Sequence, residues 1–185
     1  QRLRVPRHEV EAPVSLGAAS QPSAWGRLRE LVMYCFDTSA FVNPWRRYYP
    51  LDLFPSVWEH IDRCIVDGSI LAAHEVHHEL DQKDDELLQY IKARDGLFVP
   101  LDEQQQGYVA EIVNQFPSWI NPESTKNSAD PFIVALARQR QLTVVTYEQK
   151  AGHGSPRVQI PNVCEHYGIP WVPYLRFLKD SGFRG

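Results

Sequence analysis

The chain has 185 residues, of which 43% are hydrophobic and 23% charged, and its formal net charge is −4. This composition is that of an ordinary globular domain, long enough to bury a core, and the negative charge argues against a protein that coats nucleic acid. No apolar stretch approaches the length of a membrane span, and the three cysteines are far apart and odd in number. We therefore expect a protein of the bacterial or archaeal cytoplasm, with buried thiols and no membrane association.

Residues 1–32 differ from the rest of the chain. They contain three prolines and no sustained hydrophobic period, and their five Arg against three Glu give a charge of +2, which leaves −6 for residues 33–185. Such a composition is typical of a disordered arm. We therefore divide the chain into a flexible N-terminal extension, residues 1–32, and a globular domain, residues 33–185.

From Met33 onward, predicted strands alternate with predicted helices. Short apolar runs predict buried strands over residues 33–36, 69–73, 97–99, 142–146 and 171–172. Helical spacing of apolar residues predicts helices over residues 53–66, 74–94, 103–116, 131–140 and 163–167. Alternation of this kind implies right-handed βαβ units. We expect an α/β fold with a parallel sheet between helical layers.

Four acidic residues stand at the ends of strands or on helices of this pattern. Asp37 closes the first strand, Glu79 lies on the second long helix, and Glu148 comes two residues after the strand that ends at Thr146. Asp130 is predicted to cap the helix that begins with Pro131. The carboxyl ends of parallel strands face the crevice where open α/β sheets bind ligands. Carboxylates gathered there without a cation would repel one another, so the pattern indicates a divalent metal site with oxygen ligands, for Mg²⁺ or Mn²⁺.

The segments that carry these acids resemble the PIN-domain nucleases, the fold of VapC-type toxins. The matching segments are residues 36–41, 76–80, 129–137 and 144–148, and the resemblance covers roughly residues 33–179. It implies a PIN-like three-layer α/β/α sandwich and a metal-dependent endoribonuclease, the toxin of a type II toxin–antitoxin system. The resemblance assigns the metal and the catalysis to Asp37, Glu79, Asp130 and Glu148, with one or two ions bound. Ser39 and Thr146 would support ligands and water.

The resemblance also implies partners. RNA is the expected substrate, a cognate antitoxin protein is the expected partner, and a homodimer is left open. Candidates for contact with the RNA phosphates are Arg46, Arg47, Lys126 and Lys150. For the extension, an antitoxin-like or RNA-contacting role is the alternative to a flexible arm. One departure from the family is Glu148, since the fourth acid there is usually Asp.

A competing motif lies on the same predicted helix as Glu79. The run His74-Glu75-Val76-His77-His78 satisfies the zinc-peptidase pattern H-E-x-x-H, in which two His bind Zn²⁺ and the Glu is the general base. A peptidase needs a third ligand from another element, and only Glu103 lies at a conceivable distance. A third hypothesis is a PIN-like module that binds without cutting.

An aromatic cluster lies near the first acid, at positions 41, 45, 48 and 49. Packing within a loop is the interpretation we favour for it. Stacking on unpaired bases is the alternative.

Overall fold

The computed structural model describes residues 32–83, 85–119, 128–152, 154–155 and 157–185. Within these residues five strands form one sheet in the order β3-β2-β1-β4-β5, and every neighbouring pair is parallel. The central strand β1 pairs with β2 on one side and with β4 on the other. The strands are β1 (Tyr34–Phe36), β2 (Ile70–Ala73), β3 (Phe98–Val99), β4 (Thr143–Thr146) and β5 (Trp171–Pro173).

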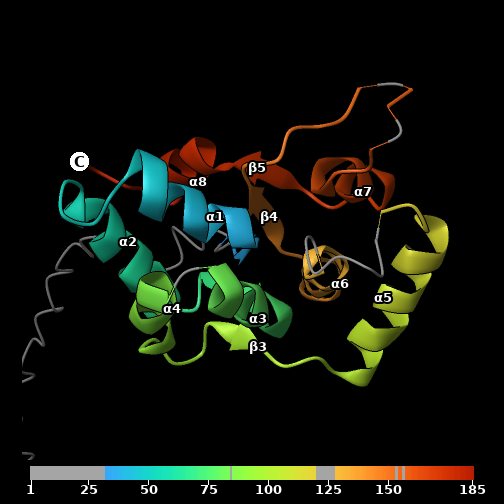
Figure 1. Ribbon diagram of the computed structural model, residues 1–185, viewed down its shortest axis with the longest axis horizontal. Coiled ribbons are helices and arrows are strands. Elements are labelled where there is room, and N and C mark those ends of the chain that lie inside the picture. Colours follow the sequence, from blue (N-terminus) through green and yellow to red (C-terminus); the bar gives the residue numbers. More distant parts are fainter. Residues whose placement is uncertain (1–31, 84, 120–127, 153, 156) are drawn as a thin grey trace, which may run out of the picture.

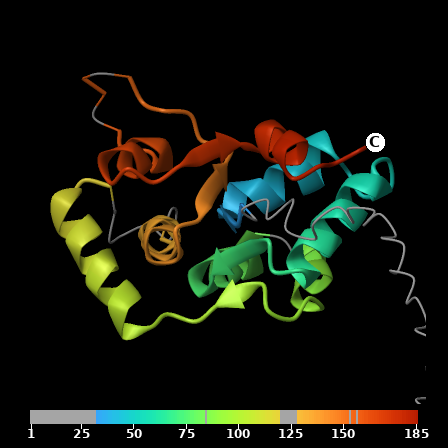
Figure 2. The ribbon, with the colours of Figure 1, turned by 180° about the vertical axis from the view of Figure 1, so that it is seen from behind.

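Helices cover both faces of this sheet. Helices α5, α6 and α7 lie on one face and α2, α4 and α8 on the other, as the two opposite views show (Figures 1 and 2). The predicted α/β/α sandwich with a central parallel sheet is therefore confirmed. The helices are α1 (Thr38–Asn43), the π-helical segment η1 (Pro44–Tyr48), α2 (Pro55–Val66), α3 (His74–Lys83), α4 (Asp85–Lys92), α5 (Glu103–Gln115), α6 (Asp130–Arg140), α7 (Ile160–His166) and α8 (Tyr174–Asp180).

Strand β1 shows why its sequence is an unbroken apolar run. Its side chains alternate between the two helical layers, as they do in any strand. The rings of Tyr34 and Phe36 meet the ring of Phe177 on α8, with centroids 4.8 and 4.9 Å apart. Between them, the Cys35 thiol points the other way and donates to the carbonyl of Ile133 on α6, at 3.6 Å. Both faces of the strand are buried, so no polar residue interrupts it.

The observed elements correct three details of the sequence prediction. The helix predicted over residues 74–94 is two helices, α3 and α4, on either side of residue 84, which lies outside the described residues. Asp130 is the first residue of α6, and the N-cap position belongs to Ala129. Two helical stretches were not predicted: α1 with η1, directly after β1, and α8 at the end of the chain. Residues 1–31 and Lys126 also lie outside the described residues, so the predictions made for them stay predictions.

The unpredicted helices share a reason. Helix α1 has six residues and α8 has seven, too short for a helical hydrophobic period to stand out from the flanking apolar residues. In α8 the buried residues Tyr174, Phe177 and Leu178 do follow helical spacing. Tertiary packing, more than local propensity, stabilises such short helices.

Candidate carboxylate site

Asp37 lies between the end of β1 and the start of α1, and it caps that helix. Its Oδ1 accepts from the backbone N–H of Ala40 at 2.7 Å, and Ser39 Oγ lies 2.8 and 2.9 Å from the two carboxylate oxygens. Thr146 Oγ1, at the end of β4, donates to Oδ2 at 2.7 Å. Only 3% of Asp37 is exposed. Burial raises the pKa of this carboxyl to about 6, even though the three donors act in the opposite direction.

Glu79, on α3, joins the start of α1 to the start of α6. Thr38 Oγ1 donates to its Oε2 at 2.6 Å. Its other oxygen accepts from the Ala129 N–H at 3.0 Å and from Ser128 Oγ at 3.3 Å. Glu79 is 3% exposed. Thr38 follows Asp37, and Ala129 precedes Asp130. The bonds of Glu79 therefore bring the first turn of α6 close to the carboxyl end of β1, where Asp37 lies.

Asp130 and Glu148 complete the set. Asp130 is 6% exposed at the start of α6, which is buried from Ile133 to Ala137. Glu148 follows β4, and its backbone N–H donates to Thr146 Oγ1 at 2.9 Å. The Ile160 N–H, at the start of α7, donates to the Glu148 carboxylate at 2.7 Å. When its amide is oriented to donate, Gln159 reaches both oxygens of the same carboxylate at 3.1 Å.

The carboxylates influence one another electrostatically. Burial is the main cause that raises the pKa of Glu148 to about 7, and the charges of Asp37 and Glu79 add to it. The charge of Glu79 likewise contributes to the raised pKa of Asp37. Mutual repulsion of this kind means that the charged forms lie near one another in a medium of low dielectric. A cation would relieve it.

The two residues predicted as supports both lie beside Asp37. Ser39 Oγ and Thr146 Oγ1 each bond Asp37, and each also accepts a backbone N–H from the segment after β4, that of Tyr147 at 2.9 Å in the case of Ser39. Sequence reasoning missed Thr38 and Ser128, which bond Glu79. The only available signal was their position in the sequence: Thr38 follows Asp37, and Ser128 lies two residues before Asp130.

The donor set fits a hard divalent cation, because carboxylate oxygens are the ligands that Mg²⁺ and Mn²⁺ prefer. As the side chains stand, no three Asp, Glu, His or Cys among the described residues are gathered closely enough to hold an ion. Hydroxyl and amide donors contact the carboxylate oxygens instead. Mg²⁺ usually keeps several of its waters and needs only one or two carboxylates directly. A hydrated ion among these acids is therefore compatible with the geometry.

The predicted phosphate contacts have different environments. Arg46 and Arg47 are exposed on η1. Lys150 is exposed but forms an ion pair with Glu165, so it would have to leave that carboxylate to reach a substrate. Lys126 falls outside the described residues.

The H-E-x-x-H motif does occupy one helical turn. The His74 and His78 rings lie 4.9 Å apart between centroids, and His77 packs edge-on against Phe98 at 5.2 Å. Burial and the neighbouring positive groups lower the pKa of His77. Glu103 is the first residue of α5. No third ligand joins the His pair within the described chain.

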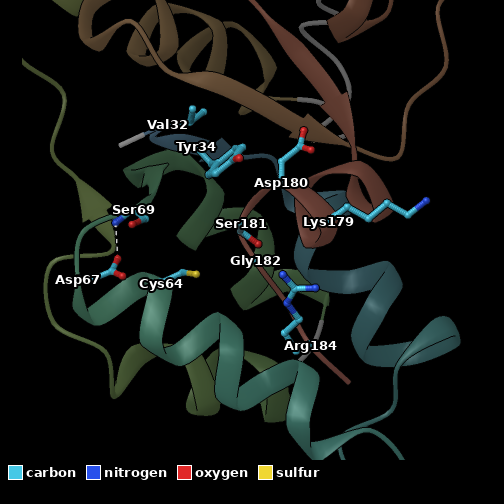
Figure 3. Close-up of a pocket in the computed structure, with 10 residues that line it drawn as sticks. All are labelled: Val32, Tyr34, Cys64, Asp67, Ser69, Lys179, Asp180, Ser181, Gly182 and Arg184. Atoms are coloured by element: carbon cyan, nitrogen blue, oxygen red, sulfur yellow. Dashed lines mark hydrogen bonds between the residues drawn. The ribbon is translucent and has the colours of Figure 1, made fainter. Parts of the chain in front are cut away.

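A cavity of about 640 Å³ lies near the amino end of β1, opposite to the end that Asp37 follows (Figure 3). It is lined by Tyr34 at the start of β1, by Cys64 and Asp67 from the end of α2, and by the segment from Lys179 to Arg184. Asp37 follows the other end of β1. The cavity and the carboxylates therefore have no residue in common.

Residues 34–184 match the family model described as "Domain of unknown function (DUF4411)". The chain belongs to the DUF4411 family. No curated protein matches this DUF4411 chain. Among solved structures, it is similar to the crystal structure of FitAcB from Neisseria gonorrhoeae, with 17% sequence identity and a TM-score of 0.48. That match covers 77% of the DUF4411 chain and 99% of the other. Within its described residues, no helix is long and apolar enough to cross a membrane.

Proposed function

We propose that this DUF4411 protein is a metal-dependent endoribonuclease that hydrolyses RNA phosphodiester bonds. The observation that supports this best is the set of acids Asp37, Glu79, Asp130 and Glu148, which we call the carboxylate cluster. It lies near the carboxyl ends of β1 and β4. Three of its acids are at most 6% exposed. Burying several carboxylates together is costly unless a cation accompanies them, and such costly arrangements concentrate at functional sites.

Asp37, Glu79, Asp130 and Glu148 would hold one or two Mg²⁺ or Mn²⁺ ions. Such an ion, when bound, lowers the pKa of a coordinated water and neutralises charge on the phosphate. The chain's own residues provide the positioning. Ser39 and Thr146 fix the orientation of Asp37, and Thr38 fixes that of Glu79. The Ile160 N–H fixes the orientation of Glu148.

The choice of RNA and the role as a toxin with a cognate antitoxin follow from the resemblance to PIN-domain nucleases. Arg46 and Arg47 are exposed on η1. This segment directly follows α1, the helix that Asp37 caps. We propose that they contact the RNA phosphates, where Arg is favoured for its paired donors. A cytoplasmic toxin that is held inactive by a partner protein is the corresponding biological role.

Cleavage of a mixed-sequence single-stranded RNA, with EDTA, Mg²⁺, Mn²⁺ or Zn²⁺ present, tests this proposal. We expect cleavage with Mg²⁺ or Mn²⁺ and none with EDTA. Asp130→Asn should abolish it while leaving the thermal unfolding transition in place, because the substitution removes charge without changing side-chain size. Asp95→Asn is the matched control, since Asp95 is exposed and remote from the cluster in sequence. Metal-dependent cleavage at the wild-type rate by Asp130→Asn would contradict the proposal.

A further inference from the structure

Four tyrosines form a column of stacked rings beside the carboxylates. Tyr48 and Tyr147 are 5.3 Å apart between centroids with their planes within 2°, and Tyr147 and Tyr174 are 5.5 Å apart at 24°. Tyr49 also stacks on Tyr174, at 5.8 Å and 30°. These are offset-stacked geometries of the kind that aromatic rings favour. Tyr48, Tyr147 and Tyr174 are therefore stacked in series, and Tyr49 also contacts Tyr174.

The column is joined to the catalytic residues through its second member. Tyr147 stands between Thr146 and Glu148 in the chain, and its N–H donates to Ser39 Oγ at 2.9 Å. The same Ser39 hydroxyl bonds Asp37. Tyr147 therefore links the Tyr48 ring to the segment that carries Thr146 and Glu148.

The outer end of the column is open. Tyr174 is 1% exposed, whereas Tyr48 is 52% exposed although Tyr147 covers one of its faces. Tyr48 ends the π-helical segment η1, whose closing bond runs from the Tyr49 N–H to the Pro44 carbonyl, at 2.8 Å. π-helical turns are rare and are frequently found at functional sites.

We infer that Tyr48 is a stacking platform for an unpaired nucleobase of the substrate. This inference rests on the proposed function and adds its substrate class: single-stranded RNA, with one base stacked on the exposed face of Tyr48. A flat aromatic ring that is already fixed on one face loses little freedom when a base covers the other. Every base has such a face, so the platform selects for an unpaired strand and tolerates any sequence. Arg46 and Arg47, on the same segment, provide positive charge for the adjoining phosphates.

The test compares Tyr48→Leu, which keeps an apolar side chain but no ring, with Tyr48→Phe, which keeps the ring. Both are made in the Asp130→Asn background and measured with EDTA, so that cleavage does not consume the strand and the repulsion by the acids is reduced. The probes are a fluorescent single-stranded RNA of mixed sequence and its fully paired duplex. Thermal unfolding of each variant checks the fold, which an exposed side chain should affect little.

We expect Tyr48→Leu to bind the single strand about fivefold to a hundredfold more weakly than the parent, which is the usual effect of losing one stacked base. Tyr48→Phe should stay within about twofold of the parent, and binding of the duplex should be the same in all three. Equal single-strand affinities in the leucine variant and the parent would overturn the inference, as would failure of the parent to bind single strands. Loss of binding in Tyr48→Leu combined with no cleavage by the wild type would uphold the platform and refute the nuclease.

Discussion

Without metal, Asp37→Asn should be more stable than the wild type by an amount that increases with pH. Burial raises the pKa of Asp37 from its ordinary value of 3.8 to about 6. A carboxyl whose pKa is raised by folding favours the folded state in its protonated form. The stability that it contributes is complete below about pH 4 and is lost as the pH rises through about 6. The asparagine has no charge to lose or gain in this range.

The magnitude follows from the size of the shift. One pKa unit corresponds to about 1.4 kcal/mol, so the ionised Asp37 costs the folded state about 3 kcal/mol once the pH is well above 6. At about pH 4.5 the wild type has lost only about 1 kcal/mol of stability, because this pH is only slightly above the ordinary pKa of the unfolded carboxyl and well below its pKa in the folded chain. The free energy of unfolding of Asp37→Asn, relative to the wild type, should therefore rise by about 2 kcal/mol between pH 4.5 and pH 8.

Urea unfolding at the two pH values, with EDTA present, measures this change. The asparagine makes poorer hydrogen bonds with Ser39 and Thr146, but that cost is the same at both pH values and cancels in the comparison. Asp95→Asn, on the surface, should differ from the wild type by less than about 0.5 kcal/mol at either pH. A stability difference for Asp37→Asn that stays constant or falls from pH 4.5 to pH 8 would refute the reasoning that a buried, ionisable charge sits at the end of β1.

Three further predictions concern the histidines, Thr38 and the extension. His74→Ala combined with His78→Ala should leave RNA cleavage intact, whereas stoichiometric Zn²⁺ in the wild type that disappears from the double variant would favour the peptidase hypothesis. Thr38→Val, which removes the hydroxyl that orients Glu79, should reduce cleavage by about tenfold to a hundredfold; an unchanged rate would show that Glu79 needs no such support. A chain that starts at Met33 should cleave RNA like the full chain, because β1 begins at Tyr34 and all four acids follow it. Higher activity on deletion, with a gap that salt narrows, would indicate instead that the arm inhibits the site.

The positions of the acids could be predicted because they follow from local patterns. A buried apolar run that ends in Asp, such as residues 33–37, locates both the strand and the carboxylate at its carboxyl end. The parallel sheet followed from the alternation of strands and helices, and the structure confirms it. The exact order β3-β2-β1-β4-β5 was not predicted. All five strands are short and mostly apolar, so little in their sequences distinguishes a central strand from an edge strand.

The contacts that complete the site could not be predicted, because they join residues that are distant in sequence. Tyr48 and Tyr147 are separated by about a hundred positions and meet only once β1 and β4 pair. The sequence favoured loop packing for the aromatic residues near Tyr48, and the Tyr48 ring does pack on Tyr147 while the residue stays 52% exposed. Asp130 was predicted as a helix cap from its type and from Pro131, yet Ala129 takes that position.

Binding of Mn²⁺ and cleavage of RNA, titrated together on one preparation, test the central claim most directly. The wild type should bind one or two Mn²⁺ ions, and the cleavage rate should rise over the same range of Mn²⁺ concentration. Glu79→Gln should lose both by about a hundredfold or more, since even residues that only support metal ligands cost up to that much. Glu59→Gln, an exposed substitution of the same chemistry on α2, should lose neither. Cleavage that persists with EDTA, or Mn²⁺ binding that is unchanged in Glu79→Gln, would contradict a metal-dependent nuclease built on these carboxylates.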